Sequence, residues 1–136
     1  LNVTQAVIPW LKMRNEGHII NITSIAAKEA YPQGNVYCAT KAAVDQLTKG
    51  MRMDLLPYGI KVSSIAPGAA ETEFSLVRFK GDESQASAVY QGFTPLDAKD
   101  IAEVVQFIVT RPSHVSIHDL VIMPAAQASA TLFKKD

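Results

Sequence analysis

Two side chains in the run Tyr37-Cys38-Ala39-Thr40-Lys41 have the types and the spacing that acid–base chemistry requires. Residues four apart on a helix lie on the same face, so the ammonium of Lys41 can approach the phenol oxygen of Tyr37. A free tyrosine has a pKa of about 10, and a nearby positive charge lowers it. Lowering that pKa to about 7 or 8 takes about 3–4 kcal/mol, which one close ammonium in a partly dry cleft can supply. The pair therefore predicts a general acid/base with Tyr37 exchanging the proton.

A third hydroxyl, that of Ser24, stands thirteen residues before Tyr37 at the end of an apolar run. The run predicts a strand over 18–24, followed by a loop over 25–34 and a helix over 35–56. Asn35 can cap this helix, and Pro57-Tyr58-Gly59 can end it. This order would place all three functional side chains around one crevice at the carboxyl end of a sheet.

These motifs resemble a known family. The segment from Gly17 to Lys41 resembles the short-chain dehydrogenases/reductases, whose strand-borne serine and Tyr-x-x-x-Lys pair have this separation. The turn Ile65-Ala66-Pro67-Gly68, followed by Thr72, resembles the family's turn beside the nicotinamide. Three more segments resemble the branch of NADP-dependent 3-hydroxy acid (serine/allo-threonine) dehydrogenases: Glu73 to Asp82, Arg111 to Val115, and Met123-Pro124. The resemblance covers essentially the whole chain.

The resemblance implies a role for each matching residue. Lys41 would hold the nicotinamide ribose hydroxyls in addition to acting on Tyr37. Pro67 and Gly68 would shape the nicotinamide pocket, and Thr72 would contact the carboxamide. A plain turn and a helix cap are the alternatives for these residues, and Thr72 can serve both purposes. Ser24 would hydrogen-bond the substrate oxygen, where charge develops during the reaction.

Substrate contacts are expected from two further regions. Arg78 and Lys80 lie in an irregular stretch over 69–95 that has the character of a lid, and either could pair with a carboxylate. Solvated surface charge is the alternative for both. Gln33 and Asn35 are candidates at the rim of the pocket, with turn and cap roles as alternatives.

Composition limits the partners and the compartment. Thirteen basic and thirteen acidic residues balance, which argues against a nucleic-acid partner. The single cysteine, Cys38, excludes an internal disulfide and agrees with a reducing, cytoplasmic location. No apolar run reaches the length of a membrane span, so no membrane partner is expected. His114 and His118 lack an acidic or cysteine cluster, so we expect no metal.

Strands that alternate with helices predict an α/β fold with a parallel sheet. By resemblance, this is the C-terminal part of a Rossmann-like doubly wound parallel sheet with flanking helices. In the Tyr37 helix we expect Val44, Leu47, Met51 and Leu55 to form an apolar stripe, and Gly50 to pack closely against another helix. The remaining expected elements are a helix over 2–15 that contains Pro9, a strand over 60–66, short helices near 72–79 and 84–91, a helix that Asp97 caps and that stops at Arg111-Pro112, and a strand over 117–123.

The sequence begins within a helical pattern, and no glycine has another within eight positions. A Gly-rich phosphate loop is therefore not present in these residues. We expect residues 1–136 to be the C-terminal catalytic and substrate-binding half of a single short-chain dehydrogenase domain. The N-terminal dinucleotide-binding half would precede Leu1, and the fragment alone would be inactive.

The resemblance implies an oxidoreductase that transfers a hydride between NADP, or NAD, and the hydroxyl-bearing carbon of a 3-hydroxy acid or β-hydroxy amino acid. One alternative is a carbonyl reductase of broad range that uses the same residues. Another is a non-catalytic fragment that retains only a subunit-association surface. By resemblance, the helix over 2–15 and the Tyr37 helix would form a homodimer, and the tail from Pro124 would support a homotetramer.

Overall fold

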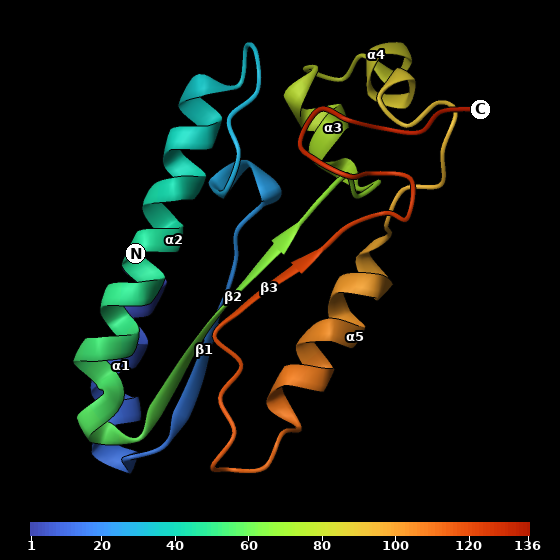
Figure 1. The fold of residues 1–136 in the computed structure, drawn as a ribbon. Helices are drawn as coiled ribbons and strands as arrows, with labels where there is room; N and C mark the ends of the chain where they lie inside the picture. The colour runs from blue at the N-terminus through green and yellow to red at the C-terminus, as the bar shows by residue number, and fades with distance from the viewer.

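The computed structural model describes residues 1–136 and has one parallel sheet of three strands in the order β1-β2-β3 (Figure 1). The strands are β1 (Gly17–Ile22), β2 (Ile60–Pro67) and β3 (Asp119–Ile122). Ile19 lies opposite Val62, and Ile65 lies opposite Leu120. The predicted α/β class and all three predicted strands are confirmed, although β1 ends two residues before Ser24.

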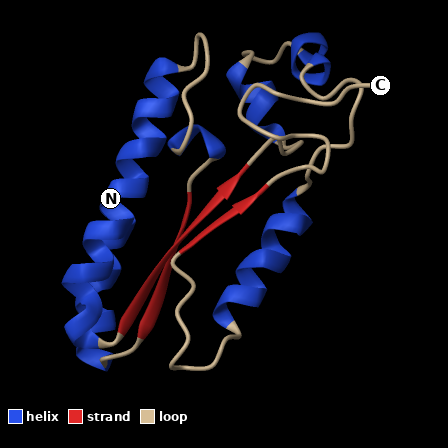
Figure 2. Ribbon diagram, viewed as in Figure 1, coloured by secondary structure: helices blue, strands red, loops and turns tan.

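Five helices accompany the sheet (Figure 2). They are α1 (Asn2–Arg14), α2 (Asn35–Leu55), α3 (Glu73–Arg78), α4 (Glu83–Ala88) and α5 (Ala98–Val109), with 3₁₀ turns η1 (Ile25–Ala27) and η2 (Leu56–Tyr58). Every predicted helix is present, and α1 continues through Pro9. In Figure 1, α1 and α2 lie on one side of the sheet and α5 lies on the other.

The ends of two helices test the predicted caps. Asp97 begins α5 with a capping box, because Asp100 N donates to Asp97 Oδ1 at 2.9 Å and Asp97 N donates to Asp100 Oδ2 at 2.8 Å. The predicted cap of α2 was wrong by one residue. Gly34 is the N-cap, since its carbonyl accepts the first helical bond, from Cys38 N at 2.8 Å, and Asn35 is already helical.

The core lies between α2 and the central strand. Leu55, Ile60 and Val62 form a buried cluster, against which Ile8 and Leu11 of α1 pack. Ile65 is completely buried farther along β2. Because β2 is paired on both edges and covered on both faces, it is the most deeply buried element and fixes where the neighbouring strands end.

The apolar stripe predicted for α2 is only partly correct. Leu55 is buried, but Leu47 is 41% exposed, and the face against the sheet includes Asp45 and Thr48, which are 2% and 0% exposed. The predicted close packing at Gly50 is wrong within this chain, because no atom lies within 4 Å of the position that a Cβ would take. The helix itself was predicted correctly. The pattern of apolar residues does not reveal that the sheet and its loops provide polar partners for the buried face of this helix.

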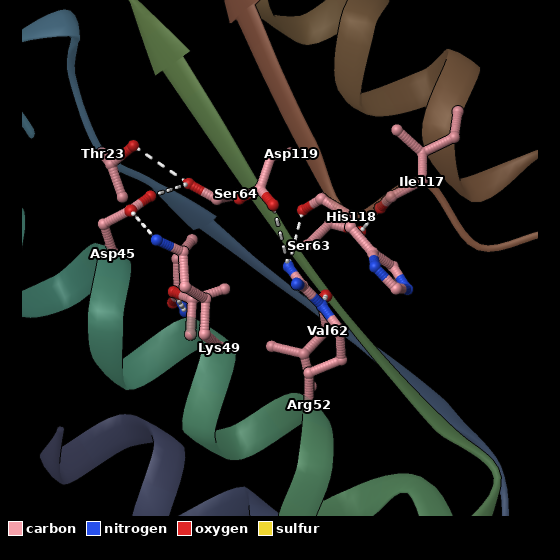
Figure 3. A network of polar contacts seen from close by, with 12 residues as sticks. Thr23, Asp45, Lys49, Arg52, Val62, Ser63, Ser64, Ile117, His118 and Asp119 are labelled. Atoms are coloured by element: carbon pink, nitrogen blue, oxygen red, sulfur yellow. Dashed lines mark hydrogen bonds and ion pairs between the residues drawn. The ribbon is translucent and has the colours of Figure 1, made fainter. Parts of the chain in front are cut away.

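These polar partners form the network shown in Figure 3. The Asp45 carboxylate receives hydrogen bonds or ion pairs from Lys28 at 2.6 Å and Lys49 at 3.0 Å. Arg52 donates from Nε to the carbonyl of Val62 at 2.9 Å and from Nη2 to the carbonyl of His118 at 2.8 Å. Together these contacts tie α2 to the loop after β1 and to the strands β2 and β3.

Candidate active site

A cavity of about 330 Å³ lies beyond the carboxyl ends of β1 and β2. Figure 1 shows α3, α4 and the C-terminal trace at this end of the sheet. Six of the residues predicted for the site line this cavity: Ser24, Tyr37, Pro67, Gly68, Thr72 and Arg78. Lys41 and Gln33 do not line it.

Ser24 and Tyr37 reach the cavity from different elements. Ser24 has an extended backbone just past β1, and its Oγ caps η1 by accepting a hydrogen bond from Ala26 N at 3.1 Å. Tyr37 lies in the first turn of α2, with its ring centroid 5.6 Å from that of Phe74 in α3. The Ser24 hydroxyl opposes the effect of burial and lowers the pKa of the Tyr37 phenol.

Lys41 lies one turn farther along α2 on the same side of the helix. Its Nζ is 5.8 Å from the centroid of the Tyr37 ring and donates to the carbonyl of Ile22 at 3.4 Å. Burial lowers the pKa of Lys41 from its ordinary value. The ammonium is therefore held between the end of β1 and the tyrosine ring, outside the cavity itself.

The expected lowering of the Tyr37 pKa was wrong for this chain. Burial raises the pKa of Tyr37 above 10, and it outweighs the opposite effects of the Ser24 hydrogen bond and the Arg78 charge. The Lys41 ammonium donates to the Ile22 carbonyl at 3.4 Å. The raised pKa favours the neutral form of the phenol.

The turn after β2 is packed tightly from the C-terminal side. A Cβ on Gly68 would overlap Oε1 of Gln127 and would lie 2.8 Å from Sδ of Met123, so a larger residue here would require both side chains to shift. The next residue, Ala69, donates its N–H to Gln127 Oε1 at 2.8 Å. Thr72 does cap α3, because its Oγ1 accepts a hydrogen bond from Phe74 N at 3.3 Å.

The candidate substrate contacts are exposed. Arg78 lines the main cavity and also an adjoining cavity of about 330 Å³, which Gln33 and Tyr37 share. Gln33 has a φ of 63°, in the left-handed region typical of a tight turn. Lys80 lines neither cavity. The geometry therefore favours Arg78 over Lys80 as an anion ligand.

Several cavity residues were not predicted. The tail contributes Gln127, Ala130 and Phe133, and the segment after α4 contributes Tyr90. The hydroxyl of Tyr90 lies 2.6 Å from Ser75 Oγ and donates to the carbonyl of Ala70 at 2.9 Å, which ties the lid region to the turn after β2. No local sequence pattern marks these residues, because their partners lie up to 101 residues away in the chain.

Other sites considered in the sequence have no counterpart in the structure. His114 and His118 do not join any group of three or more side chains that could hold a metal ion. None of the helices combines the length and apolar character that crossing a membrane requires.

Comparison with known proteins identifies the family. The family model of the short chain dehydrogenases matches residues 1–83, which is more than half of the chain. A parallel α/β sheet with Ser24 and Tyr37 at one cavity agrees with this match, and the chain belongs to the short-chain dehydrogenase family.

Individual relatives are close in sequence and structure. The chain is 46% identical over 131 residues to an NADP-dependent 3-hydroxy acid dehydrogenase of Escherichia coli, covering 96% of the chain and 53% of that protein. It is 47% identical over 129 residues to a sulfoacetaldehyde reductase of Chromohalobacter salexigens, covering 94% and 51%. The closed form of a serine dehydrogenase complexed with NADP⁺ superimposes with a TM-score of 0.91 at 45% identity, covering 98% of this chain and 54% of that one. The chain spans about half the length of the curated relatives it matches.

Proposed function

We propose that residues 1–136 are the C-terminal half of an NADP-dependent dehydrogenase that oxidises a 3-hydroxy acid or a β-hydroxy amino acid. The observation that carries this proposal is the single cavity into which Ser24, Tyr37 and Arg78 converge. A hydroxyl, a phenol and a guanidinium are the groups required to bind an alcohol oxygen, move its proton and hold an anionic group. The names of the relatives supply the substrate class and the nucleotide.

The cavity residues fit the nicotinamide end of NADP. The turn at Pro67 and Gly68 gives an apolar wall beside Tyr37, and the Thr72 hydroxyl at its edge offers a partner for the carboxamide. Lys41, at the end of β1, would hold the ribose hydroxyls. When bound, the cofactor would supply the hydride acceptor. The phosphate contacts would come from the half of the protein before Leu1.

In the oxidation direction the substrate alcohol loses a proton and a hydride and becomes a carbonyl. Ser24 would donate a hydrogen bond to the substrate oxygen, and Tyr37 would take its proton. The raised pKa of Tyr37 suits the reverse reaction directly, because a neutral phenol can protonate the oxygen of a carbonyl substrate. In the oxidation direction a shift of the Lys41 ammonium from the Ile22 carbonyl toward the phenol would favour the phenolate that accepts the proton.

The test of this function uses the full-length protein, NADP⁺ and a panel of 3-hydroxy acids matched with uncharged alcohols. We expect Tyr37→Phe to lower kcat by about 10²- to 10⁴-fold, since it removes the group that transfers the proton. Tyr58→Phe is the control, because that tyrosine packs against Lys12 outside the cavity. A Tyr37→Phe enzyme as active as Tyr58→Phe would rule out the proposed mechanism.

The panel also separates the alternative activity. A carbonyl reductase of broad range would convert the uncharged compounds as well as the acids. A preference for acids would support Arg78 as the anion ligand, since it is the cationic side chain that lines the cavity. Oxidation of none of the hydroxy acids would leave the non-catalytic alternative.

We also propose that the protein is a homodimer or homotetramer in which α1 and α2 form an interface. Four large apolar side chains of α1 are exposed, with Val3 at 78%, Val7 at 39%, Trp10 at 67% and Met13 at 70%. In α2, Met53 is 71% exposed and the space beside Gly50 is open. Burying such a surface against a second copy would account for its apolar character.

A further inference from the structure

The C-terminal segment from Pro124 to Asp136 folds back over the end of the sheet as a hairpin (Figure 1). Gln127 and Phe133 form an antiparallel bridge, and Ala128 N donates to the carbonyl of Leu132 at 2.9 Å. The hairpin places Ala130 and Phe133 in the wall of the main cavity. This part of the cavity wall belongs to no helix or strand, so its position depends on specific contacts with the rest of the chain.

Three of the contacts that hold the hairpin in place join it to different parts of the chain. Ala130 N donates to Oε2 of Glu29 at 2.7 Å, which joins residues 101 positions apart. Gln127 accepts from Ala69 N at 2.8 Å on the side of the turn after β2. The rings of Phe133 and Phe93 lie 5.0 Å apart, between centroids. The hairpin is therefore attached both to the loop that follows Ser24 and to the turn at Gly68.

The Glu29 contact differs from the other two in chemistry. A backbone N–H that donates to a carboxylate makes a charge-assisted bond, which is stronger than a bond between neutral groups. It acts on Ala130, a small residue that lines the cavity. Any larger side chain at position 130 would take up space in a cavity of about 330 Å³.

We propose that Ala130 sets the largest substituent that a substrate can carry on its hydroxyl-bearing carbon, and that Glu29 is the positioning residue that holds Ala130 there. The size limit rests on the proposed dehydrogenase function. The Glu29 contact does not, since it is a feature of the folded chain. The two parts therefore have separate tests.

The size limit is tested with Ala130→Val and Ala130→Leu in the full-length enzyme, using 3-hydroxypropanoate and the 3-hydroxy acids of four, five and six carbons. In these variants we expect kcat/KM to fall for the longest acid that the unaltered enzyme oxidises. This loss should be at least about tenfold larger than the loss for 3-hydroxypropanoate. Leucine should have a larger effect than valine. Ala128→Leu is the matched control, because Ala128 is exposed on the same hairpin and does not line the cavity. Equal losses for short and long acids in a folded Ala130→Leu enzyme would overturn the size limit.

The Glu29 contact is tested by amide hydrogen exchange at Ala130 in the absence of substrate. Glu29→Ala should speed this exchange by about tenfold, and Glu29→Gln should largely retain protection because its amide oxygen can still accept the bond. Unchanged exchange in Glu29→Ala would refute the positioning role. If the unaltered enzyme oxidised no hydroxy acid, the proposed function would fail, while the exchange result would still decide the role of Glu29.

Discussion

The ion-pair network of Asp45 allows a quantitative test of what holds the Tyr37 helix on the sheet. Asp45 is 2% exposed, and its carboxylate contacts Lys28 at 2.6 Å and Lys49 at 3.0 Å. Ser64 of β2 donates a weaker hydrogen bond at 3.4 Å. Replacing Asp45 by asparagine keeps the shape of the side chain but removes the charge that both lysines face.

The loss of stability in Asp45→Asn can be estimated from how deeply the carboxylate and the two lysines are buried. Removing one partner of a fully buried ion pair costs about 3–5 kcal/mol. The lysine side chains are 28% and 41% exposed, so water can solvate their ammonium groups after the change. We therefore expect Asp45→Asn to lower the free energy of unfolding by about 2 kcal/mol. This is less than the cost of breaking a fully buried ion pair and more than the cost of at most about 1 kcal/mol for an exposed pair.

The effect should also depend on pH in a defined direction. Burial alone would raise the pKa of Asp45, but the hydrogen bonds and charges of Lys28 and Lys49 outweigh it and hold that pKa below its ordinary value. A carboxyl with a depressed folded-state pKa stabilises the fold above its unfolded pKa of about 3.9, and this stabilisation is lost as pH falls through the folded-state pKa. The difference in the free energy of unfolding between the unaltered protein and Asp45→Asn should thus be constant from about pH 8 to 5 and shrink below about pH 4.

Urea denaturation of the full-length protein, followed by far-UV circular dichroism, measures this difference. Glu103→Gln is the control, because Glu103 pairs with Lys99 at 3.8 Å and both side chains are mostly exposed, at 65% and 81%. That change should cost less than about 0.5 kcal/mol. An Asp45→Asn variant as stable as Glu103→Gln would refute the argument that the buried carboxylate anchors α2.

Three further predictions concern binding and assembly. Thr72→Ala should raise the Kd of NADP⁺ about fivefold, as measured by fluorescence titration, through loss of one hydrogen bond; unchanged affinity in a folded variant would remove Thr72 from the cofactor site. Arg78→Ala should raise KM for hydroxy acids by about 10- to 100-fold while leaving uncharged alcohols unaffected, and equal effects on both classes would contradict an anion-binding role. Trp10→Asp should shift the full-length protein to smaller species in light scattering coupled to gel filtration, because it places a charge on the exposed face of α1; a purely monomeric unaltered protein would disprove the interface.

The fold was largely predictable because its signals are local. Periodic apolar residues, the Asp97 capping box and the Pro57-Tyr58-Gly59 stop determine where elements begin and end, and each acts within a few residues. The cap of α2 was misassigned because Asn35 and Gly34 are both acceptable caps in sequence. Only the position of the Gly34 carbonyl, which accepts from Cys38 N, decides between them.

The site residues that belong to one strand-loop-helix unit could be predicted from the sequence. Those that come from distant parts of the chain could not. Ser24 and Tyr37 are positioned by adjacent elements, so their spacing was sufficient to place them together. Gln127 and Ala130 line the same cavity, but their hydrogen-bond partners, Ala69 and Glu29, precede them in the chain by 58 and 101 residues. A contact of that separation depends on the path of the whole chain and leaves no periodic signal.

The geometry of α2 connects the chemistry to the stability of the fold. Tyr37, Lys41, Asp45 and Lys49 follow one another at intervals of four, so they form one nearly continuous row along the helix. Tyr37 lines the cavity and Lys41 lies just outside it, whereas Asp45 and Lys49 belong to the network that ties the helix to β2. This explains why the buried face of α2 is polar where an apolar stripe was expected. A shift of the helix that relaxed the Asp45 network would also move the Tyr37 phenol relative to Ser24, so the positions of the two proposed catalytic groups are coupled to a buried charge outside the cavity.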